Sequence, residues 1–172
     1  MHLVLYGLSH KTAPLELRER VVLDSGQALA LLGRFRQGEP AVEGALVSTC
    51  NRVELVLAGA PAEVLGPLAR RVPLEFRPDF ERADASGSTY FLVGVEAVRH
   101  LFRVAAGLDS AVLGEAQILG QIRDAHALAT EVGSTGALLD RLLTSAIHAG
   151  KRVRAETDLG TGAASVSAAA VE

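Results

Sequence analysis

Cys50 is the only cysteine of the chain and the side chain best suited to nucleophilic chemistry. It lies at a Cys-Asn-Arg break between strands predicted at residues 44–50 and 53–58, which indicates a turn from one strand to the next. A thiol at the tip of such a turn is held in place yet reachable, and the cationic Arg52 would favour its thiolate form. An inert cysteine that ends a strand explains this stretch equally well.

His100 is the second candidate, on a helix predicted at residues 96–108. It lies between the apolar stripe of that helix and its arginine face, about 40° from Val104 around the axis. A histidine there can be partly desolvated and still face a cleft, as a general acid, general base or orienting residue requires. A boundary histidine that bonds to backbone is the simpler interpretation of this position alone.

Four polar residues gather around the start of the next predicted helix, residues 115–132. Ser110 and Glu115 precede or begin it, and helix N-termini bind anions and polar ligands well. Gln117 and Gln121 follow one turn apart, opposite the apolar side. An ordinary solvated and capped helix face accounts for all four residues as well.

A third long helix, ending near residue 156, places four polar side chains along one stripe: Arg141, Ser145, His148 and Arg152. Such a stripe could follow a phosphate backbone. A solvated face is an equally good interpretation, because helix C-termini favour cations through the helix dipole.

Composition excludes several classes of protein. One cysteine cannot form an internal disulfide, and a net charge of −3 gives no sign of nucleic-acid binding by the chain as a whole. No apolar run reaches the length of about 18 residues that a membrane helix needs, and no signal peptide precedes the first strand. We therefore expect a cytoplasmic protein that does not enter the membrane.

No cofactor site is predicted within the chain. The histidines and the cysteine lack HxxxH or CxxC spacing, so no metal site is expected. The glycine pattern at residues 160–165 lacks the third glycine of a dinucleotide fingerprint and follows a helix where a strand is needed.

The order of the elements predicts an α+β fold: a small mixed or antiparallel sheet with packed helices, and an all-helical C-terminal half. The predicted strands are residues 3–8, 44–50, 53–58 and 90–93, and the predicted helices of the first half are 15–22, 25–37 and 61–71. Residues 73–90 are expected to be irregular.

Apolar stripes predict two buried helix faces: Ala28, Leu29, Leu32 and Phe35 on the second helix, and Leu138, Leu142, Ala146, Ala149 and Val153 on the last. On the helix of His100 the predicted stripe is Ala97, Leu101, Val104, Ala105 and Leu108.

Five stretches together resemble the N-terminal catalytic domain of the glutamyl-tRNA reductases. They are residues 7–14 (GLSHKTAP), 48–54 (STCNRVE), 100–110 (HLFRVAAGLDS), 114–121 (GEAQILGQ) and 149–157 (AGKRVRAET). The stretches fall in the family's order and spacing and span nearly the whole chain.

The resemblance implies a reaction and a set of site residues. Cys50 would attack the ester of glutamyl-tRNA to form a glutamyl thioester, which NADPH reduces to glutamate-1-semialdehyde in tetrapyrrole (porphyrin) biosynthesis. His100 would orient or polarise the reacting ester, and the guanidinium of Arg52 would grip the substrate carboxylate. The residues implied to hold the substrate glutamate are Thr49, Asn51, Arg52, Ser110, Glu115, Ala116, Gln117 and Gln121.

The chain departs from the family pattern in two ways. The family usually has proline at the position of Ala116, although we expect the loop to persist because Glu115 and Gln117 are kept. The family also continues into an NADPH-binding domain and a dimerisation domain. Residues 1–156 are therefore expected to form the catalytic and glutamate-recognition domain, and residues 157–172 a linker and the start of the NADPH-binding domain. The cofactor site and the homodimer would belong to the longer enzyme, as would a possible partnership with glutamate-1-semialdehyde aminotransferase.

Two other functions compete with this interpretation. A non-catalytic tRNA-binding module would use the stripe of Arg141, His148 and Arg152 and would not need Cys50. An unrelated cysteine hydrolase would need a histidine partner and no tRNA. Neither alternative explains the five spaced stretches.

Overall fold

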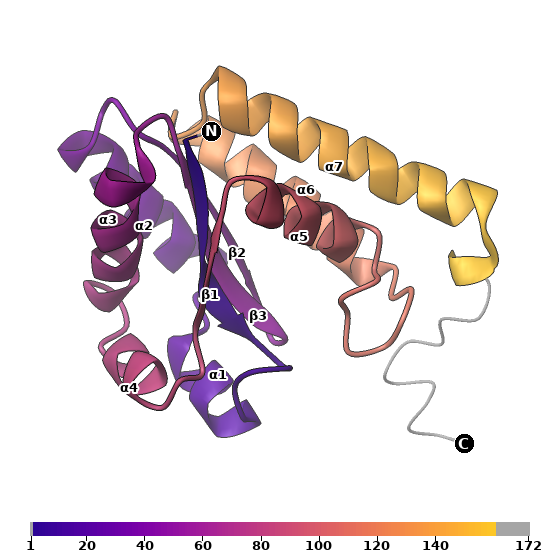
Figure 1. Ribbon diagram of the computed structural model, residues 1–172, viewed down its shortest axis with the longest axis horizontal. Coiled ribbons are helices and arrows are strands. Elements are labelled where there is room, and N and C mark those ends of the chain that lie inside the picture. Colours follow the sequence, from indigo (N-terminus) through magenta and orange to yellow (C-terminus); the bar gives the residue numbers. More distant parts are fainter. Residues whose placement is uncertain (1, 161–172) are drawn as a thin grey trace.

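The computed structural model describes residues 2–160 of the chain. Within them, four strands form one sheet that lies between two layers of helices (Figure 1). The strands are β1 (Leu3–Ser9), β2 (Glu43–Thr49), β3 (Arg52–Ala58) and β4 (Tyr90–Val93). One layer consists of α1 (Leu15–Val21), α2 (Ser25–Gly38), α3 (Ala62–Leu74) and α4 (Asp79–Ala85). The other consists of α5 (Val95–Ala105), α6 (Gln117–Glu131) and α7 (Ala137–Glu156), followed by the short 3-10 helix η1 (Asp158–Gly160).

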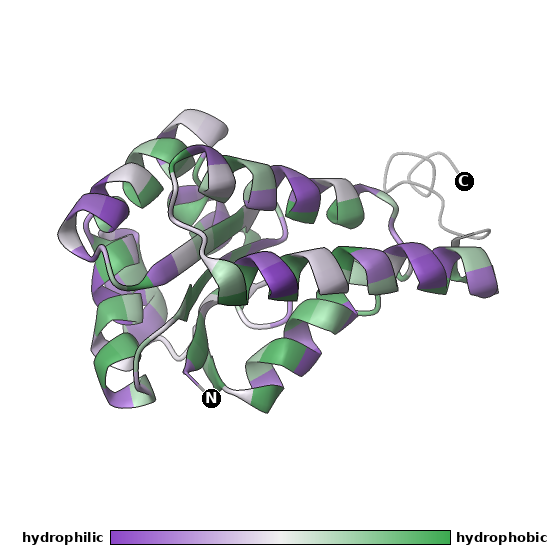
Figure 2. Cartoon of the chain, turned by 90° about the horizontal axis from the view of Figure 1, so that it is seen from above, coloured by the Kyte–Doolittle hydropathy of each residue, from purple (hydrophilic) through white to green (hydrophobic). Residues whose placement is uncertain are grey.

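The sheet has the order β2-β3-β1-β4, and every neighbouring pair is antiparallel. The predicted α+β class is confirmed. Helices cover both faces of the sheet, so β1 and β3 are buried along their whole length, and both are mostly apolar apart from Ser9, Arg52 and Glu54. In Figure 2 the helices alternate between hydrophilic and hydrophobic residues along their length, as amphipathic elements on a sheet should.

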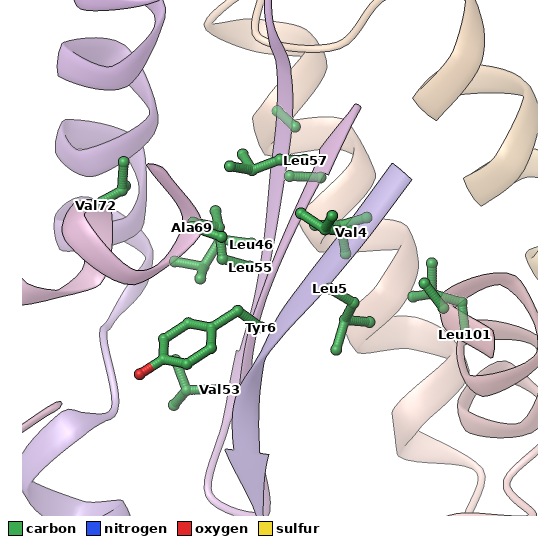
Figure 3. Close-up of a cluster of buried hydrophobic side chains, with 14 of the residues drawn as sticks. Val4, Leu5, Tyr6, Leu46, Val53, Leu55, Leu57, Ala69, Val72 and Leu101 are labelled. Carbon is green, nitrogen blue, oxygen red and sulfur yellow. The ribbon is translucent and has the colours of Figure 1, made fainter. Parts of the chain in front are cut away.

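Alternate residues of each strand face opposite helix layers. Tyr6 and Val53 point to the side of α3, where Ala69 lies, whereas Leu5 points toward Leu101 of α5 (Figure 3). By the same alternation, Arg52 and Glu54 of β3 lie on the face covered by α5, α6 and α7. The two charged residues are therefore directed into the interior between the sheet and the second helix layer.

Glu43, at the start of β2, caps the N-terminus of α7. Its two carboxylate oxygens accept hydrogen bonds from the backbone N–H groups of Leu138 (3.2 Å) and Leu139 (2.6 Å). A Cβ on Gly136 would lie only 2.6 Å from the Glu43 Oε1 atom, so the glycine leaves room for the cap. This contact fixes where α7 begins relative to the sheet.

The stripe predicted for α7 is confirmed only in part: Ala146 is buried, Leu142 is partly buried against the core, and Ala149 and Val153 are half-buried. The buried residues of α7 are Leu139, Leu143, Ala146, Ile147 and Gly150, and Leu138 is 37% exposed. Two adjacent apolar stripes run along this helix, and close packing selects between them. Gly150 lies against the backbone carbonyl of Ala105 in α5, where a side chain would collide.

Several smaller predictions also need correction. The prediction that residues 73–90 are irregular missed α4, a two-turn helix after Pro78. On α2, Leu31 is buried in place of the exposed Leu29, and Leu108 lies beyond the end of α5 and is 37% exposed. Predictions for residues 161–172 concern residues outside those that the structure describes.

The helices of residues 2–160 include none that could cross a membrane. None of them combines the length and the apolar composition that a bilayer span requires.

Candidate active site

Cys50 lies at the tip of the β2–β3 hairpin and is exposed. The predicted turn between two strands is confirmed. The Thr49 hydroxyl shapes this turn from the inside, accepting hydrogen bonds from the backbone N–H groups of Asn51 (3.2 Å) and Arg52 (3.1 Å). A threonine that bonds the backbone two and three residues ahead closes a tight turn without glycine.

Two neighbouring segments hold the same turn from outside. Arg18 of α1 donates through Nη1 to the backbone carbonyl of Cys50 (2.6 Å) and to the Asn51 Oδ1 atom (3.1 Å). The backbone N–H of His10, just after β1, donates to the Asn51 carbonyl (2.8 Å). The backbone that carries the thiol is therefore tied to α1 and β1 as well as to its own strands.

A buried ion pair lies behind the turn. Arg52 is 1% exposed and Glu54 is fully buried, and Arg52 Nη1 donates to the Glu54 Oε1 atom at 2.9 Å. Arg52 Nη2 also donates to the backbone carbonyl of Asp109, whose carboxylate bonds to the ammonium of Lys11. Whether Arg52 favours the thiolate of Cys50 stays a prediction, because its guanidinium already pairs with Glu54 and lies 3.6 Å from the Asp109 carboxylate.

His100 reaches the same carboxylate from α5. Its Nε2 atom lies 2.7 Å from Glu54 Oε1, and its Nδ1 atom lies 4.0 Å from Asp109 Oδ2. The Tyr90 hydroxyl donates to Glu54 Oε1 too, and its ring meets the imidazole edge-on, with 5.5 Å between ring centroids. The side chain of His100 keeps 16% exposure, so one part of the ring remains open to a ligand.

The carboxylates of this cluster stay ionised. Burial pushes the pKa of Glu54 up, but the hydrogen bond from His100 and the charge of Arg52 outweigh it and lower that pKa below its ordinary value. Burial likewise opposes ionisation of Asp109, yet the bond from Lys11 and the charge of Arg52 lower its pKa. The charges of Arg52, Lys11, Glu54 and Asp109 therefore sum to zero.

His10 has the opposite environment. Burial and the positive charges of Arg52, Lys11 and Arg18 lower the pKa of the His10 imidazole. A neutral imidazole thus adjoins the turn of Cys50 at neutral pH.

Unpartnered polar atoms concentrate around the hairpin tip. Among the described residues, six buried side-chain nitrogen or oxygen atoms lack a hydrogen-bond partner: His10 Nδ1, Arg18 Nε, Arg52 Nε, Glu54 Oε2, Ser110 Oγ and Arg154 Nε. Five of the six belong to residues in or next to the cluster of the hairpin. Buried polar groups are normally satisfied, so this concentration is what a site awaiting a polar ligand would show.

The structure brings some of the residues expected to hold the substrate together and separates others. Thr49, Asn51 and Arg52 form the turn, and Ser110 follows Asp109, whose carbonyl accepts from Arg52. Glu115, Ala116 and Gln117 lie where α6 begins, and no hydrogen bond within residues 2–160 joins their side chains to the turn. Gln121 lines a pocket of about 200 Å³ beside Leu46 and Ser48 of β2.

The polar stripe of α7 looks like a solvated helix face. Its members Arg141, Ser145, His148 and Arg152 are all exposed. Arg152 donates to both carboxylate oxygens of Glu156 one turn later, at 3.0 and 3.2 Å. That pairing uses one of the cations that a phosphate backbone would need.

Sequence reasoning gave no individual role to several residues that shape this site. They are His10, Lys11, Arg18, Glu54, Tyr90 and Asp109. One signal could have identified Glu54: two charged residues at i and i+2 in an apolar strand lie on one buried face. Arg18, Tyr90 and Asp109 carry no such signal, because only the tertiary structure brings them to the hairpin.

The described residues do not fit a dinucleotide cofactor. Rossmann-type sites need a glycine-rich turn between a parallel strand and a helix, whereas every strand pair among residues 2–160 is antiparallel. The same residues contain no group of three or more side chains placed to hold a metal ion.

Comparison with known proteins gives a consistent result. The family model described as "Glutamyl-tRNAGlu reductase, N-terminal domain" matches residues 6–157. A glutamyl-tRNA reductase of Thermus thermophilus is 48% identical over 174 residues, which cover 99% of this chain and 40% of the relative. One from a Synechococcus strain is 45% identical over 172 residues, covering 100% of this chain and 39% of the relative.

A solved structure agrees with the sequence relatives. The glutamyl-tRNA reductase from Methanopyrus kandleri superposes with a TM-score of 0.76 at 35% identity, over 99% of this chain and 38% of that one. The chain thus spans about two fifths of the length of the relatives that it matches. The resemblance seen in the sequence is confirmed, and the chain belongs to the family of glutamyl-tRNA reductase N-terminal domains.

Proposed function

We propose that this chain accepts the glutamyl group of glutamyl-tRNA on Cys50 as a thioester. One observation carries the proposal: an exposed thiol on a firmly held turn adjoins a buried cluster of Arg52, Glu54 and His100 that contains unpartnered polar atoms. A positioned nucleophile beside a polar recognition site is the arrangement that covalent acyl transfer needs.

The proposed step conserves atoms and charge. The sulfur of Cys50 forms a bond to the ester carbonyl carbon, and the bond from that carbon to the ribose oxygen of the tRNA breaks. The proton that the thiol gives up balances the proton that the ribose oxygen takes up. The products are a glutamyl thioester on Cys50 and a tRNA with its terminal hydroxyl restored.

Recognition of the glutamate is proposed to use atoms that lack partners in the free chain. Arg52 Nε and Ser110 Oγ are unpartnered donors, and a substrate carboxylate is an acceptor that suits both. Thr49 and Asn51 would help to fix the reacting ester at the turn. The other residues proposed to contact substrate are Glu115, Ala116, Gln117 and Gln121, which would have to approach from the start of α6.

Later steps are proposed for the longer enzymes rather than for these residues. Reduction of the thioester to glutamate-1-semialdehyde would use NADPH bound by a domain that residues 2–160 do not provide. Homodimerisation and any contact with glutamate-1-semialdehyde aminotransferase would belong to the longer enzymes too. We place the reaction in tetrapyrrole biosynthesis in the cytoplasm, where a single thiol stays reduced.

The test is capture of the acyl group. The chain is incubated with radiolabelled glutamyl-tRNA, quenched in acid, and examined for protein-bound label that neutral hydroxylamine releases, as it does from thioesters. We expect stoichiometric label on the unaltered chain, slow loss of that label to water, and none on Cys50→Ala. NADPH should not speed the loss, since these residues offer it no site. Equal label on Cys50→Ala, or tRNA binding without any adduct, would contradict the proposal.

A further inference from the structure

Glu54 is the one carboxylate to which the site's histidine, arginine and tyrosine all bind. Its Oε1 atom accepts from Arg52 Nη1 (2.9 Å), from His100 Nε2 (2.7 Å) and from the Tyr90 hydroxyl. These donors come from β3, α5 and β4, three separate elements. Its second oxygen, Oε2, is buried without a partner. Every hydrogen bond that the described residues make to this fully buried carboxylate is therefore directed at one of its two oxygens.

The backbone opposite makes room for this side chain. Gly7 of β1 pairs with Glu54 in the sheet register. A Cβ on Gly7 would lie 2.8 Å from the Glu54 Cα atom and 3.0 Å from its Cγ atom, and closer still to the Val53 carbonyl. Residue 7 must therefore be glycine for Glu54 to pass over β1 toward α5.

We propose that Glu54 is a positioning residue that fixes His100 with its proton on Nε2 and presents Nδ1 as the nitrogen that meets the substrate. An ionised carboxylate can only accept, so Nε2 must be the donor of the bond between them. The neutral ring then carries its lone pair on Nδ1. Within residues 2–160 no hydrogen bond reaches that lone pair, and Asp109 Oδ2, which lies 4.0 Å from Nδ1, is an acceptor.

The charges around the ring support this arrangement. His100 is faced by Glu54 and Arg52 from β3, by Tyr90 from β4, and by Asp109, which Lys11 neutralises. The charges of Glu54, Arg52, Asp109 and Lys11 sum to zero. A bare Nδ1 can take the thiol proton of Cys50 or accept from the substrate ammonium, but it cannot donate to the ester carbonyl. Given the proposed function, the inference thus makes His100 an acceptor in the acyl transfer.

The first test reads the tautomer directly and does not depend on activity. Long-range proton–nitrogen correlation spectra of the chain labelled with 15N-histidine, at pH 8, distinguish a protonated ring nitrogen from a bare one. His100→Gln identifies the signals of His100. We expect a bare Nδ1 and a protonated Nε2. A proton on Nδ1, in either a neutral or a cationic ring, would overturn the proposal.

Two substitutions of Glu54 test the length of its side chain and its charge separately. In Glu54→Asp the carboxylate remains for Arg52, but the side chain is too short to bond to His100. Glu54→Gln keeps the length of the side chain and removes its negative charge. In Glu54→Asp we expect an Nδ1-protonated population to appear, because the Asp109 carboxylate becomes the better acceptor. The rate constant for acylation of Cys50 should fall about 10- to 100-fold, as for loss of other outer partners of a functional histidine. The half-saturating concentration of glutamyl-tRNA should change less than about threefold, since binding groups remain.

Controls make the result specific to Glu54. Tyr6→Phe removes the other buried tyrosine hydroxyl, on the opposite face of the sheet beside Asp84, and should change neither the tautomer nor the rate. Iodoacetamide should still alkylate Cys50 completely in all folded variants, which shows that the thiol remains exposed on the turn. Wild-type tautomer and wild-type acylation in both Glu54 variants would overturn the proposal. If the unaltered chain forms no adduct, the proposed function fails, whereas the spectra still decide the tautomer.

Discussion

At the scale of single residues, the burial of Arg52 and Glu54 carries a large desolvation penalty. Both are removed from water in the interior of an otherwise apolar sheet, and each is neutralised mainly by the other. Such pairs stabilise a fold little compared with apolar residues of the same size, but removal of one partner leaves the other charge buried alone. Their presence is therefore better explained by the site than by stability.

Loss of Arg52 should destabilise the chain strongly. In Arg52→Met, the buried Glu54 loses its guanidinium partner, whereas Asp109 keeps Lys11, and we expect a loss of about 3–5 kcal/mol in the free energy of unfolding. Urea denaturation at pH 7 measures it. The matched control is Arg99→Met, which breaks the exposed pair with Glu96 and should cost less than about 1 kcal/mol. Equal losses in the two variants would show that burial does not govern the cost.

Stability should also fall in acid because of Glu54 and Asp109. Their pKa values are lowered from ordinary values of 4.5 and 3.8, so the unfolded chain binds more protons in that range. Their contribution is complete above the ordinary values and is lost as the pH falls through the lowered ones. The difference in unfolding free energy between the unaltered chain and Asp109→Asn should therefore narrow between pH 7 and pH 3. A constant difference over that range would contradict this assignment.

At the scale of the elements, the sequence predicted most strands and helices because apolar runs and prolines define them locally. The hairpin around Cys50 was predicted correctly, since its turn residues interrupt two apolar strands. The buried side of α7 was not, because two apolar stripes run along it and only the approach of Gly150 to α5 selects one. Two partners of Glu54, Tyr90 and His100, could not be predicted either, since they lie 36 and 46 residues away along the chain.

The cap on α7 offers a test at this scale. Glu43→Ala removes both acceptors for the first N–H groups of α7, together with a negative charge at the positive end of the helix dipole. We expect a loss of about 1–2 kcal/mol, measured by thermal or urea unfolding. Glu39→Ala, which breaks an exposed pair with Arg71, is the control and should cost a few tenths of that. If the two variants lose the same free energy, the cap does not hold α7 to β2.

At the scale of the whole molecule, one sheet serves as the core of both helix layers. The chain changes character near residue 95, yet the second half does not form a core of its own. It covers the sheet face of Leu5, which Figure 3 shows pointing toward Leu101. By strand alternation the same face carries Arg52 and Glu54, and His100 of α5 bonds to Glu54. The site therefore lies where the two halves meet, and neither half contains it.

A shared core predicts cooperative unfolding. The described part of the chain should unfold in one transition, with far-ultraviolet circular dichroism and the fluorescence of the two tyrosines reporting the same midpoint in urea. A chain that ends at Gly94 should show no cooperative transition, because one face of its sheet would be exposed to water. A folded product of that length, with a sharp urea transition, would mean that the first half is independent.

The need for glycine at residue 7 matters for recognising natural variants that have lost this site. A single-base change that gives residue 7 a side chain would fill the space that Glu54 occupies, while Cys50, Arg52 and His100 all remain in the translated sequence. Such an allele would keep every reactive residue, yet we predict that its product would not form the proposed thioester. Residue 7 should therefore be checked together with Cys50 whenever the function of a related protein is inferred from its sequence alone.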